Sequence, residues 1–250
     1  MKVAFIITSA INFKGSSPIE ATQRLQQVVH TIDSIKSRIE NPDIFLIDSG
    51  NTVLNNNELA LIPKEVTVLS VSQSLEVEKI QNDAKSFSRK AVLKYSSAGK
   101  TQNEVENFLR IGYIKSNTEH FMIKTVFDMY DFSAYDLVFK ISGRYFLNDT
   151  FSLSNYNLSG MNVKITGSKD SMYTVLWSFS GNRFKEIKKS WNDLRSQMIS
   201  KFEESINTDI EECMFLTYIK DKEASTYTSI KILGISGIVN NPFGKALQNY

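Results

Sequence analysis

Two strand-like runs separated by a helical pattern constrain the fold of this 250-residue chain more than any other feature. Residues 2–8 form a continuous apolar run, which is typical of a parallel strand that is buried on both faces. Apolar residues then recur at helical spacing to about Arg38, and a second strand is expected at 43–48. This βαβ pattern predicts an α/β fold in which the helix crosses over in the right-handed sense.

Capping signals mark two of the expected helices. Ser17 is a suitable cap, Pro18 fits the first helical position, and Glu20 completes a capping box. Thr101 and Glu104 form a second capping box. The residues that the second helix is expected to bury are Val105, Phe108, Leu109 and Tyr113.

The remaining elements indicate one domain that spans residues 1–250. Further helices are expected at 74–95, 119–132, 181–205 and 209–220, and further strands at 66–71, 135–140, 163–165, 173–179 and 230–239. The strands at 163–165 and 173–179 are expected to be antiparallel additions to the sheet. We therefore predict a mixed, mainly parallel sheet flanked by helices, without internal repeats or linkers.

Composition excludes several classes of function. A net charge of +2 is too small to indicate a surface for nucleic acid, so any anion site must be local. One cysteine, Cys213, rules out a disulfide within the chain and a thiolate zinc site. Phosphate-binding loops, dinucleotide fingerprints and zinc-protease motifs are all absent from the sequence. Any acid–base chemistry must therefore use Asp, Glu, Lys or Tyr.

No segment of the sequence approaches the roughly 18 apolar residues of a membrane span. The short apolar run at the amino end also lacks the small-residue cleavage site of a signal peptide. We expect a cytoplasmic protein, with peripheral association at the inner face of the membrane as the alternative.

The stretch from Tyr135 to Asp149 carries the strongest functional signal. An apolar strand ends there in Lys140, Ser142, Gly143 and Arg144. Ligands of open α/β sheets bind beyond the carboxyl ends of strands, and arginine suits bidentate phosphate recognition. A phosphate-binding strand end and a basic turn that only faces solvent are equally good interpretations of this segment alone.

Other strand ends also finish in polar residues. Thr8 and Ser9 follow the first strand, Asp48 follows the second, and Gly99 and Lys100 precede a helix amino terminus. Because parallel strands end at one edge of the sheet, these residues are expected to converge on a donor-binding crevice. Asp48 either accepts hydrogen bonds from a base or ribose, or serves as a helix cap or Asx-turn.

The chain resembles GT-A-fold glycosyltransferases, whose fold is related to the Rossmann fold, and in particular the inverting group that makes bacterial polysaccharides and lipopolysaccharides. Residues 47–52, Ile-Asp-Ser-Gly-Asn-Thr, correspond to the family's Val-Asp-Asp/Asn-Gly-Ser-Thr. The family's Phe-Leu-Asp-x-Asp-Asp motif aligns with residues 139–149. The resemblance extends over residues 2–150 and continues weakly to about 220.

The resemblance implies transfer of a sugar from a nucleotide-sugar to a carbohydrate or lipid-linked acceptor. It implies a donor-binding half at 1–150 and an acceptor-side half at 151–250. The family's metal-binding aspartates fall on Ile141 and Gly143, so we expect no metal and no other cofactor. We expect Lys140 and Arg144 to stabilise the leaving diphosphate instead. In the alternative, Lys140 faces solvent and Arg144 pairs with an acid such as Asp149.

The family also implies a base near the start of a late helix. Glu211 and Glu212 match that position, with Glu212 ahead by alignment and Asp209 as the cap. Acids in a first helical turn are also favoured by the helix dipole, which needs no catalytic role. Trp177 and Trp191 are candidate platforms for an acceptor sugar, although a place in the core is the better interpretation of Trp177.

Two other functions fit the sequence. A sugar nucleotidyltransferase has a related fold, but it carries a glycine-rich loop after the first strand, and here no glycine precedes Gly15. A non-catalytic protein that binds nucleotide-sugars suits the missing aspartates as well as a metal-independent enzyme does.

Overall fold

The strand β1 (Val3–Ser9) lies between two parallel neighbours, β2 (Asp43–Asp48) and β4 (Leu137–Ser142). The computed structural model describes residues 1–12, 20–95, 101–166, 171–203, 210–220, 227–241 and 244–250. In β1, Val3, Phe5 and Ile7 point to one face of the sheet, and Ala4 and Ile6 point to the other. Burial of both faces explains why the sequence of β1 is continuously apolar.

The main sheet has seven strands in the described part of the chain. Their order is β3 (Thr67–Ser70), β2, β1, β4, β7 (Leu176–Phe179), β6 (Met161–Val163) and β8 (Tyr227–Ser229). The first four strands are parallel, β7 is antiparallel to both β4 and β6, and β8 is parallel to β6. The predicted α/β class, the mixed and mainly parallel sheet, and the antiparallel additions are confirmed.

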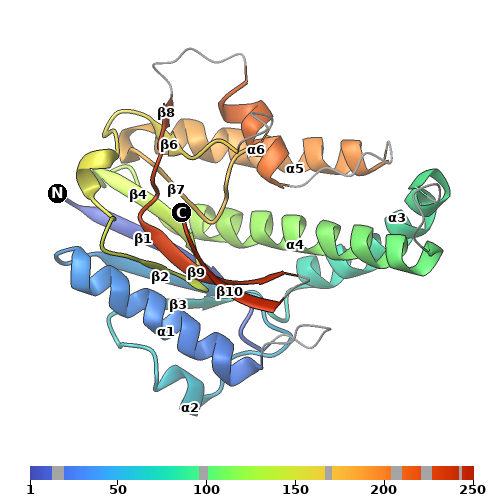
Figure 1. The fold of residues 1–250 in the computed structure, drawn as a ribbon, viewed down its shortest axis with the longest axis horizontal. Coiled ribbons are helices and arrows are strands. Elements are labelled where there is room, and N and C mark those ends of the chain that lie inside the picture. The colour runs from blue at the N-terminus through green and yellow to red at the C-terminus, as the bar shows by residue number, and fades with distance from the viewer. Residues whose placement is uncertain (13–19, 96–100, 167–170, 204–209, 221–226, 242–243) are drawn as a thin grey trace.

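Helices cover both faces of this sheet (Figure 1). The helix α1 (Ala21–Arg38) packs on one face through Leu25, Val28, Ile32 and Ile35. The other face is covered by α4 (Gln102–Met129), α5 (Phe184–Glu203) and α6 (Ile210–Tyr218). Two hydrophobic cores result, one on each side of the sheet.

A second, smaller sheet lies on the same side as α1 (Figure 1). It consists of β5 (Tyr145–Leu147), β9 (Ile235–Asn241) and β10 (Gly244–Asn249), and both pairings are antiparallel. The sequence predicts a last strand or two at 230–239 but not this sheet. The pairing of β5 with β9 joins segments that are far apart in the chain, so local patterns cannot reveal it.

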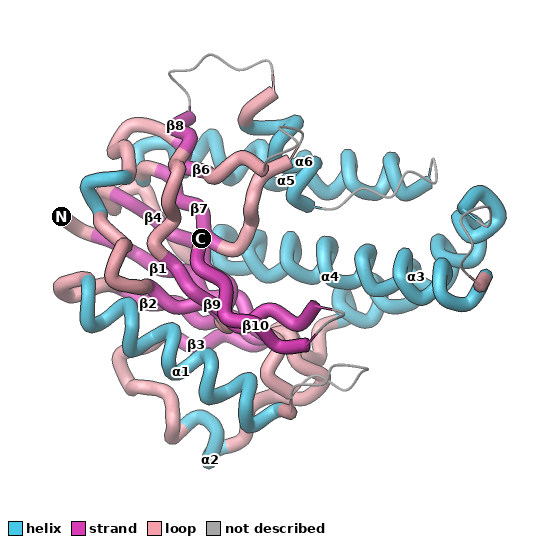
Figure 2. Tube along the Cα trace, in the orientation of Figure 1, coloured by secondary structure: helices cyan, strands magenta, loops and turns pink. Residues whose placement is uncertain are grey.

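The helices α3 (Leu75–Tyr95) and α4 pack side by side and extend past the sheet (Figure 2). Short helical segments complete the fold: α2 (Asn56–Leu59), the 3-10 turn η1 (Leu153–Asn155) and the 3-10 turn η2 (Gly181–Arg183). Within the described residues, none of the helices combines the length and apolar character needed to cross a membrane.

The helix predicted from the Thr101 capping box and the helix predicted at 119–132 are one continuous helix, α4, which ends at Met129. Its middle, residues 116–120, is polar yet buried, and this interrupts the apolar pattern on which the prediction depends. The capping box of Thr101 and Glu104 is confirmed by reciprocal hydrogen bonds. Phe108, expected to be inward, is 61% exposed.

The start of α1 also differs from the prediction. The helix begins at Ala21, and Glu20 is itself the residue before it, with no capping hydrogen bond from its side chain. The predicted cap Ser17 and the predicted first residue Pro18 lie outside the described residues.

A buried histidine makes the stability of the fold dependent on pH. His120 on α4 is 1% exposed and stacks on Trp191, with 5.4 Å between the ring centroids. Its Nε2 lies 2.6 Å from the Trp191 carbonyl oxygen, so the neutral ring donates that hydrogen bond and Nδ1 carries no proton. Burial lowers the pKa of His120 to about 4.

We expect the free energy of unfolding to fall as the pH decreases from about 6.5 to about 4. Over that pH range His120 is protonated in the unfolded chain but stays neutral in the folded chain. The free energy of unfolding therefore falls by up to about 3 kcal/mol. Urea denaturation of the wild type and of His120→Gln at several pH values tests this. The variant should lose less stability than the wild type on acidification, and His30→Gln, which changes an exposed histidine, should behave as the wild type. Equal pH dependence of wild type and His120→Gln would contradict the account.

Candidate functional site at the carboxyl ends of the strands

The carboxyl ends of β1, β2 and β4 meet at one edge of the sheet, as the sequence predicts. In the strand register Ser9 lies beside Asp48, and Thr8 lies beside Ser142. Gly143 donates its backbone N–H to the Thr8 carbonyl oxygen at 2.9 Å. The predicted donor-site residues that lie outside the described part of the chain are Gly99 and Lys100.

Asp48 organises the loops that follow β1 and β2. Its carboxylate is 0% exposed and accepts hydrogen bonds from the Ser9 hydroxyl at 2.7 Å and the Ile11 N–H at 2.8 Å. It also accepts the Gly50 N–H at 3.0 Å, which closes an Asx-turn. A Cβ at position 50 would lie 2.8 Å from a backbone nitrogen, so the turn requires glycine there. The carboxylate therefore serves the loops, as the Asx-turn interpretation predicts.

Lys140 is enclosed rather than open to a ligand. Side chains alternate along β4, and Lys140 points to the α4 side of the sheet, where it is 0% exposed. Its ammonium group forms a short ion pair with Glu119 on α4 and donates to Ser142 Oγ at 3.0 Å and the Thr174 carbonyl oxygen at 2.7 Å. Burial lowers the pKa of Lys140, and the carboxylate of Glu119 opposes that shift. Because all three N–H donors have protein partners, Lys140 joins α4, β4 and the segment before β7.

Gly143 lets the chain turn closely against β1 and α1. A Cβ at this position would lie 2.8 Å from Val28 Cγ2 and 3.2 Å from Ile7 Cγ2. The need for glycine is therefore explained by packing, without a ligand.

Arg144 is the exposed cation of the predicted motif. Its guanidinium carbon lies 5.5 Å from the ring centroid of Tyr145. Asp149, which the alternative interpretation pairs with Arg144, is bound by Arg38 at 2.6 Å. In the described part of the chain, Arg144 forms no ion pair with an acidic side chain.

A second arginine, Arg24 on α1, belongs to this edge and was missed from the sequence. Its Nη1 donates to the Ala10 carbonyl oxygen at 3.1 Å. Partial burial and the positive charge of Arg144 lower the pKa of Arg24, and the negative charge of Asp48 opposes them. One sequence signal could have indicated a role for Arg24. A positive charge near the amino end of a helix is unfavourable to the helix dipole, so its presence there indicates a function other than helix stability.

Of the two predicted acids on α6, Glu211 faces the strand ends. Its Oε1 accepts the Thr174 hydroxyl at 2.8 Å and lies 3.6 Å from Lys115 Nζ. Its Oε2 is buried and has no hydrogen-bond partner. The charge of Glu211 also raises the pKa of Lys140, which places this acid near the end of β4.

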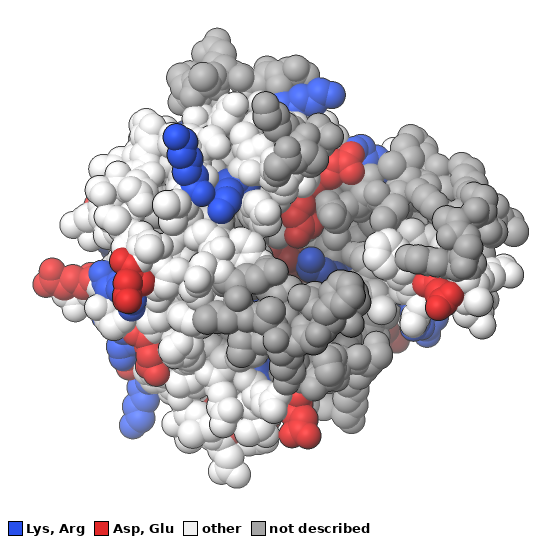
Figure 3. Space-filling model, in the orientation of Figure 1, with Lys and Arg blue, Asp and Glu red and all other residues white. Residues whose placement is uncertain are grey.

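Glu212, the acid that the alignment favours, points toward α5. It pairs with Lys201 at 3.0 Å, and its side chain is 36% exposed. Asp209 lies outside the described residues. On the face drawn in Figure 3, acidic side chains gather around α6 and the hollow between α6 and α4, with a basic side chain beside them.

Trp177 lies in the core, as the preferred interpretation predicts. It is 0% exposed, and its ring stacks on Trp191 with 5.5 Å between centroids. Trp191 is also 0% exposed. Neither ring has a free face for an acceptor sugar in this structure, which corrects the assignment of Trp177 to acceptor binding.

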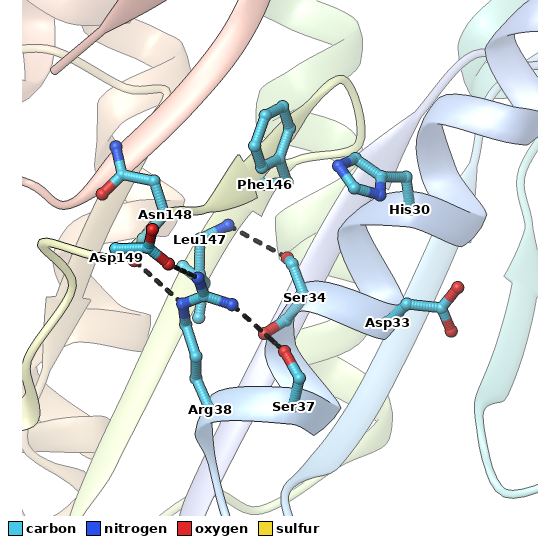
Figure 4. Close-up of a pocket in the computed structure, with 9 residues that line it drawn as sticks. All are labelled: His30, Asp33, Ser34, Ser37, Arg38, Phe146, Leu147, Asn148 and Asp149. Atoms are coloured by element: carbon cyan, nitrogen blue, oxygen red, sulfur yellow. Dashed lines mark hydrogen bonds and ion pairs between the residues drawn. The ribbon is translucent and has the colours of Figure 1, made fainter.

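A separate pocket of about 370 Å³ lies between α1 and β5 (Figure 4). Its lining residues are His30, Asp33, Ser34, Ser37, Arg38, Phe146, Leu147, Asn148 and Asp149. Arg38 closes one end by bonding the Asn148 carbonyl oxygen and Asp149, and His30 contacts Phe146 at the other end. Because α1 runs antiparallel to the strands, its second half lies away from their carboxyl ends, so this pocket is distinct from the predicted site.

The residues at the strand ends do not fit a divalent metal. Ile141 and Gly143, the positions on which the resemblance would place metal-binding aspartates, carry no carboxylate, and the nearby Asp48 is committed to loop hydrogen bonds. Within the described ranges, His, Cys, Asp and Glu side chains nowhere gather in threes or more to form a metal site.

No protein-family profile matches the chain, and no curated protein matches its sequence. Among solved structures, the chain is similar to the glycosyltransferase GlyE of Streptococcus pneumoniae TIGR4. The two share 10% sequence identity with a TM-score of 0.48, over 92% of this chain and 45% of GlyE. This chain thus spans less than half the length of that protein.

We expect Lys140→Met to reduce the free energy of unfolding by roughly 3–5 kcal/mol, because it leaves Glu119 buried without its partner. The double variant Lys140→Met/Glu119→Leu should recover most of that loss, since it removes both charges. Chemical denaturation of the three proteins measures this. A single variant as stable as the wild type would show that the buried pair does not hold α4 against β4.

Proposed function

We propose that this protein is a glycosyltransferase that moves a sugar from a nucleotide-sugar to a carbohydrate or lipid-linked acceptor. The observation that carries the proposal is the exposed guanidinium group of Arg144, which follows the carboxyl end of β4, at the same edge where Arg24 donates to the Ala10 carbonyl oxygen. Arg144 has no acidic partner in the described part of the chain, and arginine side chains suit bidentate binding of phosphate oxygens. A diphosphate placed at this edge would neutralise the repulsion between them.

The strand-end residues have distinct roles in this proposal. Thr8 and Ser9 supply the floor of the donor site, and Asp48 fixes the loops around it through its three hydrogen bonds. Lys140 acts as a positioning residue, since its contacts end at Glu119, Ser142 and Thr174. In this assignment residues 1–150 bind the nucleotide-sugar, and residues 151–250 supply the acceptor side.

The transfer reaction needs a base and stabilisation of the leaving group. The acceptor hydroxyl oxygen forms a bond to the anomeric carbon while the bond from that carbon to the diphosphate oxygen breaks. Glu211 takes the hydroxyl proton, and Arg144 and Arg24 stabilise the charge that develops on the departing diphosphate. Attack opposite the leaving group inverts the anomeric centre, and no step depends on a metal.

Glu211 is preferred to Glu212 as the base for a geometric reason. Its Oε2 is buried without a hydrogen-bond partner, and Lys115 lies 3.6 Å from its other oxygen, whereas Glu212 is held at 3.0 Å by Lys201 on α5. Burial without a hydrogen bond is unfavourable for a carboxylate oxygen, and an acceptor hydroxyl would relieve that cost. The carbonyl oxygen of Thr174 accepts a hydrogen bond from Lys140, and its hydroxyl donates to the other oxygen of Glu211 and so orients it.

We expect a cognate nucleoside diphosphate to raise the melting temperature of the wild type, and to do so equally in EDTA. Arg144→Ala should weaken that binding by about tenfold or more, because one charge-assisted contact is worth roughly 1.5–3 kcal/mol. Thermal-shift titrations with UDP, GDP and dTDP and their sugars measure this, with CMP as the monophosphate comparison. Lys64→Ala, which removes a distant exposed charge, should bind as the wild type does. No shift with any nucleotide would overturn the proposed function.

We expect Glu211→Gln to lower kcat by about 10²–10⁴-fold, the usual contribution of a general base. The variant should keep its melting temperature and its nucleotide binding, since Gln conserves the shape of the side chain. Glu212→Gln is the matched control and should retain most of the activity. The reverse pattern would assign the base to Glu212. Nucleotide binding without transfer in the wild type would instead favour the non-catalytic alternative.

A further inference from the structure

Three tyrosines from distant segments meet beside Arg144. Tyr145 begins β5, Tyr173 precedes β7, and Tyr250 follows β10. Tyr250 contacts each of the other two edge to face, with 5.7 Å between ring centroids in both pairs. We refer to Tyr145, Tyr173 and Tyr250 as the tyrosine cluster.

The tyrosine cluster is held in place by the small sheet. Gly237 on β9 lies opposite Tyr145, and a Cβ there would lie 2.3 Å from the tyrosine ring, so this glycine makes the room that the ring occupies. Tyr250 is anchored by its backbone, which donates to the Ile235 oxygen and accepts from the Gly234 N–H, both at 2.9 Å. Burial and a hydrogen bond with Tyr145 raise the pKa of the Tyr250 hydroxyl to about 12, which keeps it neutral.

Exposure differs among the three rings. Tyr145 is 3% exposed and forms the base of the cluster, whereas Tyr173 and Tyr250 are only partly buried. The cluster thus leaves part of the Tyr173 and Tyr250 side chains accessible to solvent beside the proposed donor site. An aromatic surface with polar tips suits a pyranose, which has an apolar C–H face and hydroxyls at its rim.

Two cations flank the tyrosine cluster. Lys164 Nζ lies 5.7 Å from the ring centroid of Tyr173, and the Arg144 guanidinium lies 5.5 Å from that of Tyr145. Neither forms an ion pair with an acidic side chain among the residues that the structure describes. A partly buried ammonium group over a ring, without an acid to balance it, favours a ligand that brings its own negative charge.

We propose that the tyrosine cluster binds an acceptor sugar that carries an anionic group, with the pyranose against Tyr173 and Tyr250 and the anion on Lys164. The inference deepens the proposed function and rests on it, because it names the acceptor class. Tyr173 and Lys164 belong to the acceptor-side half of the chain, and Arg144 connects the cluster to the proposed diphosphate site. The anion is a carboxylate, as in a uronic acid, or a phosphate ester.

Saturation-transfer NMR and calorimetric titration of the full chain test the proposal. The probes are methyl glycosides of gluco, galacto and manno configuration, each as the neutral sugar, the uronic acid and the 6-phosphate. At least one anionic probe should bind roughly tenfold or more tightly than its neutral counterpart, and the preferred anion identifies the source of the charge. Equal binding of neutral and anionic probes, or binding of none, would overturn the inference.

Variants locate the binding. Lys164→Ala should remove the preference for the anionic probe, and Lys164→Arg should retain it. Tyr173→Ala should weaken all sugars severalfold, whereas Tyr173→Phe keeps the ring and should bind nearly as the wild type. Lys64→Ala is the control for loss of an exposed charge. Unchanged binding in Lys164→Ala and Tyr173→Ala would place the sugar elsewhere and refute the inference.

The nucleotide titrations separate this inference from the proposed function. Lys164→Ala and Tyr173→Ala should show the wild-type thermal shift with a free nucleoside diphosphate, since neither residue contacts the proposed diphosphate site. If the wild type shows that shift but no sugar preference, only the acceptor assignment fails. If no nucleotide produces a shift, the proposed function fails as well. Circular dichroism of Tyr173→Ala shows whether it folds, and Lys164→Ala tests the proposal without altering a packed ring.

Discussion

The buried ion pair between Lys140 and Glu119 ties the central strand to the rest of the molecule. It joins β4 to α4, and the same ammonium group holds the segment before β7 through the Thr174 carbonyl oxygen. A lysine with no exposed surface would be costly without such partners, because desolvation of the charge must be offset by its contacts. The hydroxyl of Thr174 in turn donates to Glu211, so the ion pair of Lys140 and Glu119 is connected through Thr174 to the candidate base.

The charged residues at the carboxyl ends of the strands fall into two groups: those bonded within the protein and those exposed to a ligand. Asp48 and Lys140 are buried and fully engaged by the protein, and Glu119 is committed to Lys140. Arg144 remains exposed, and its positive charge lowers the pKa of Arg24, which is partly buried and donates to the Ala10 carbonyl oxygen. An edge that leaves the Arg144 guanidinium exposed and engages the carboxylates of Asp48 and Glu119 within the protein is suited to an anion rather than to a cation.

Local patterns predict those parts of the fold that depend on neighbours in the chain. The βαβ unit, the boundaries of β2 and the Thr101 capping box follow from apolar spacing and capping chemistry, and the structure confirms them. The convergence of Thr8, Ser9, Asp48 and Ser142 is also predictable, since parallel strands share an edge. The unity of α4 was missed because residues 116–120 are polar, and their partners come from distant elements, as in the pairs of Glu119 with Lys140 and His120 with Trp191.

The sequence by itself determined the α/β class, the central strands and the edge at which polar residues gather, because each depends on periodicity or on strand direction. Only the tertiary structure decided which polar residues remain available there. Side-chain alternation along β4 directs Lys140 to the buried face that α4 covers, and packing encloses Trp177. Arg24 on α1 lies near the carboxyl ends of the strands, where it donates to Ala10. The small sheet brings Tyr145 and Tyr250 together, and Tyr250 contacts Tyr173, which precedes β7 of the main sheet, although no local signal connects these segments. Whether a polar side chain can bind a ligand depends on its burial and on partners that are far away in the chain, and no single stretch of sequence encodes either.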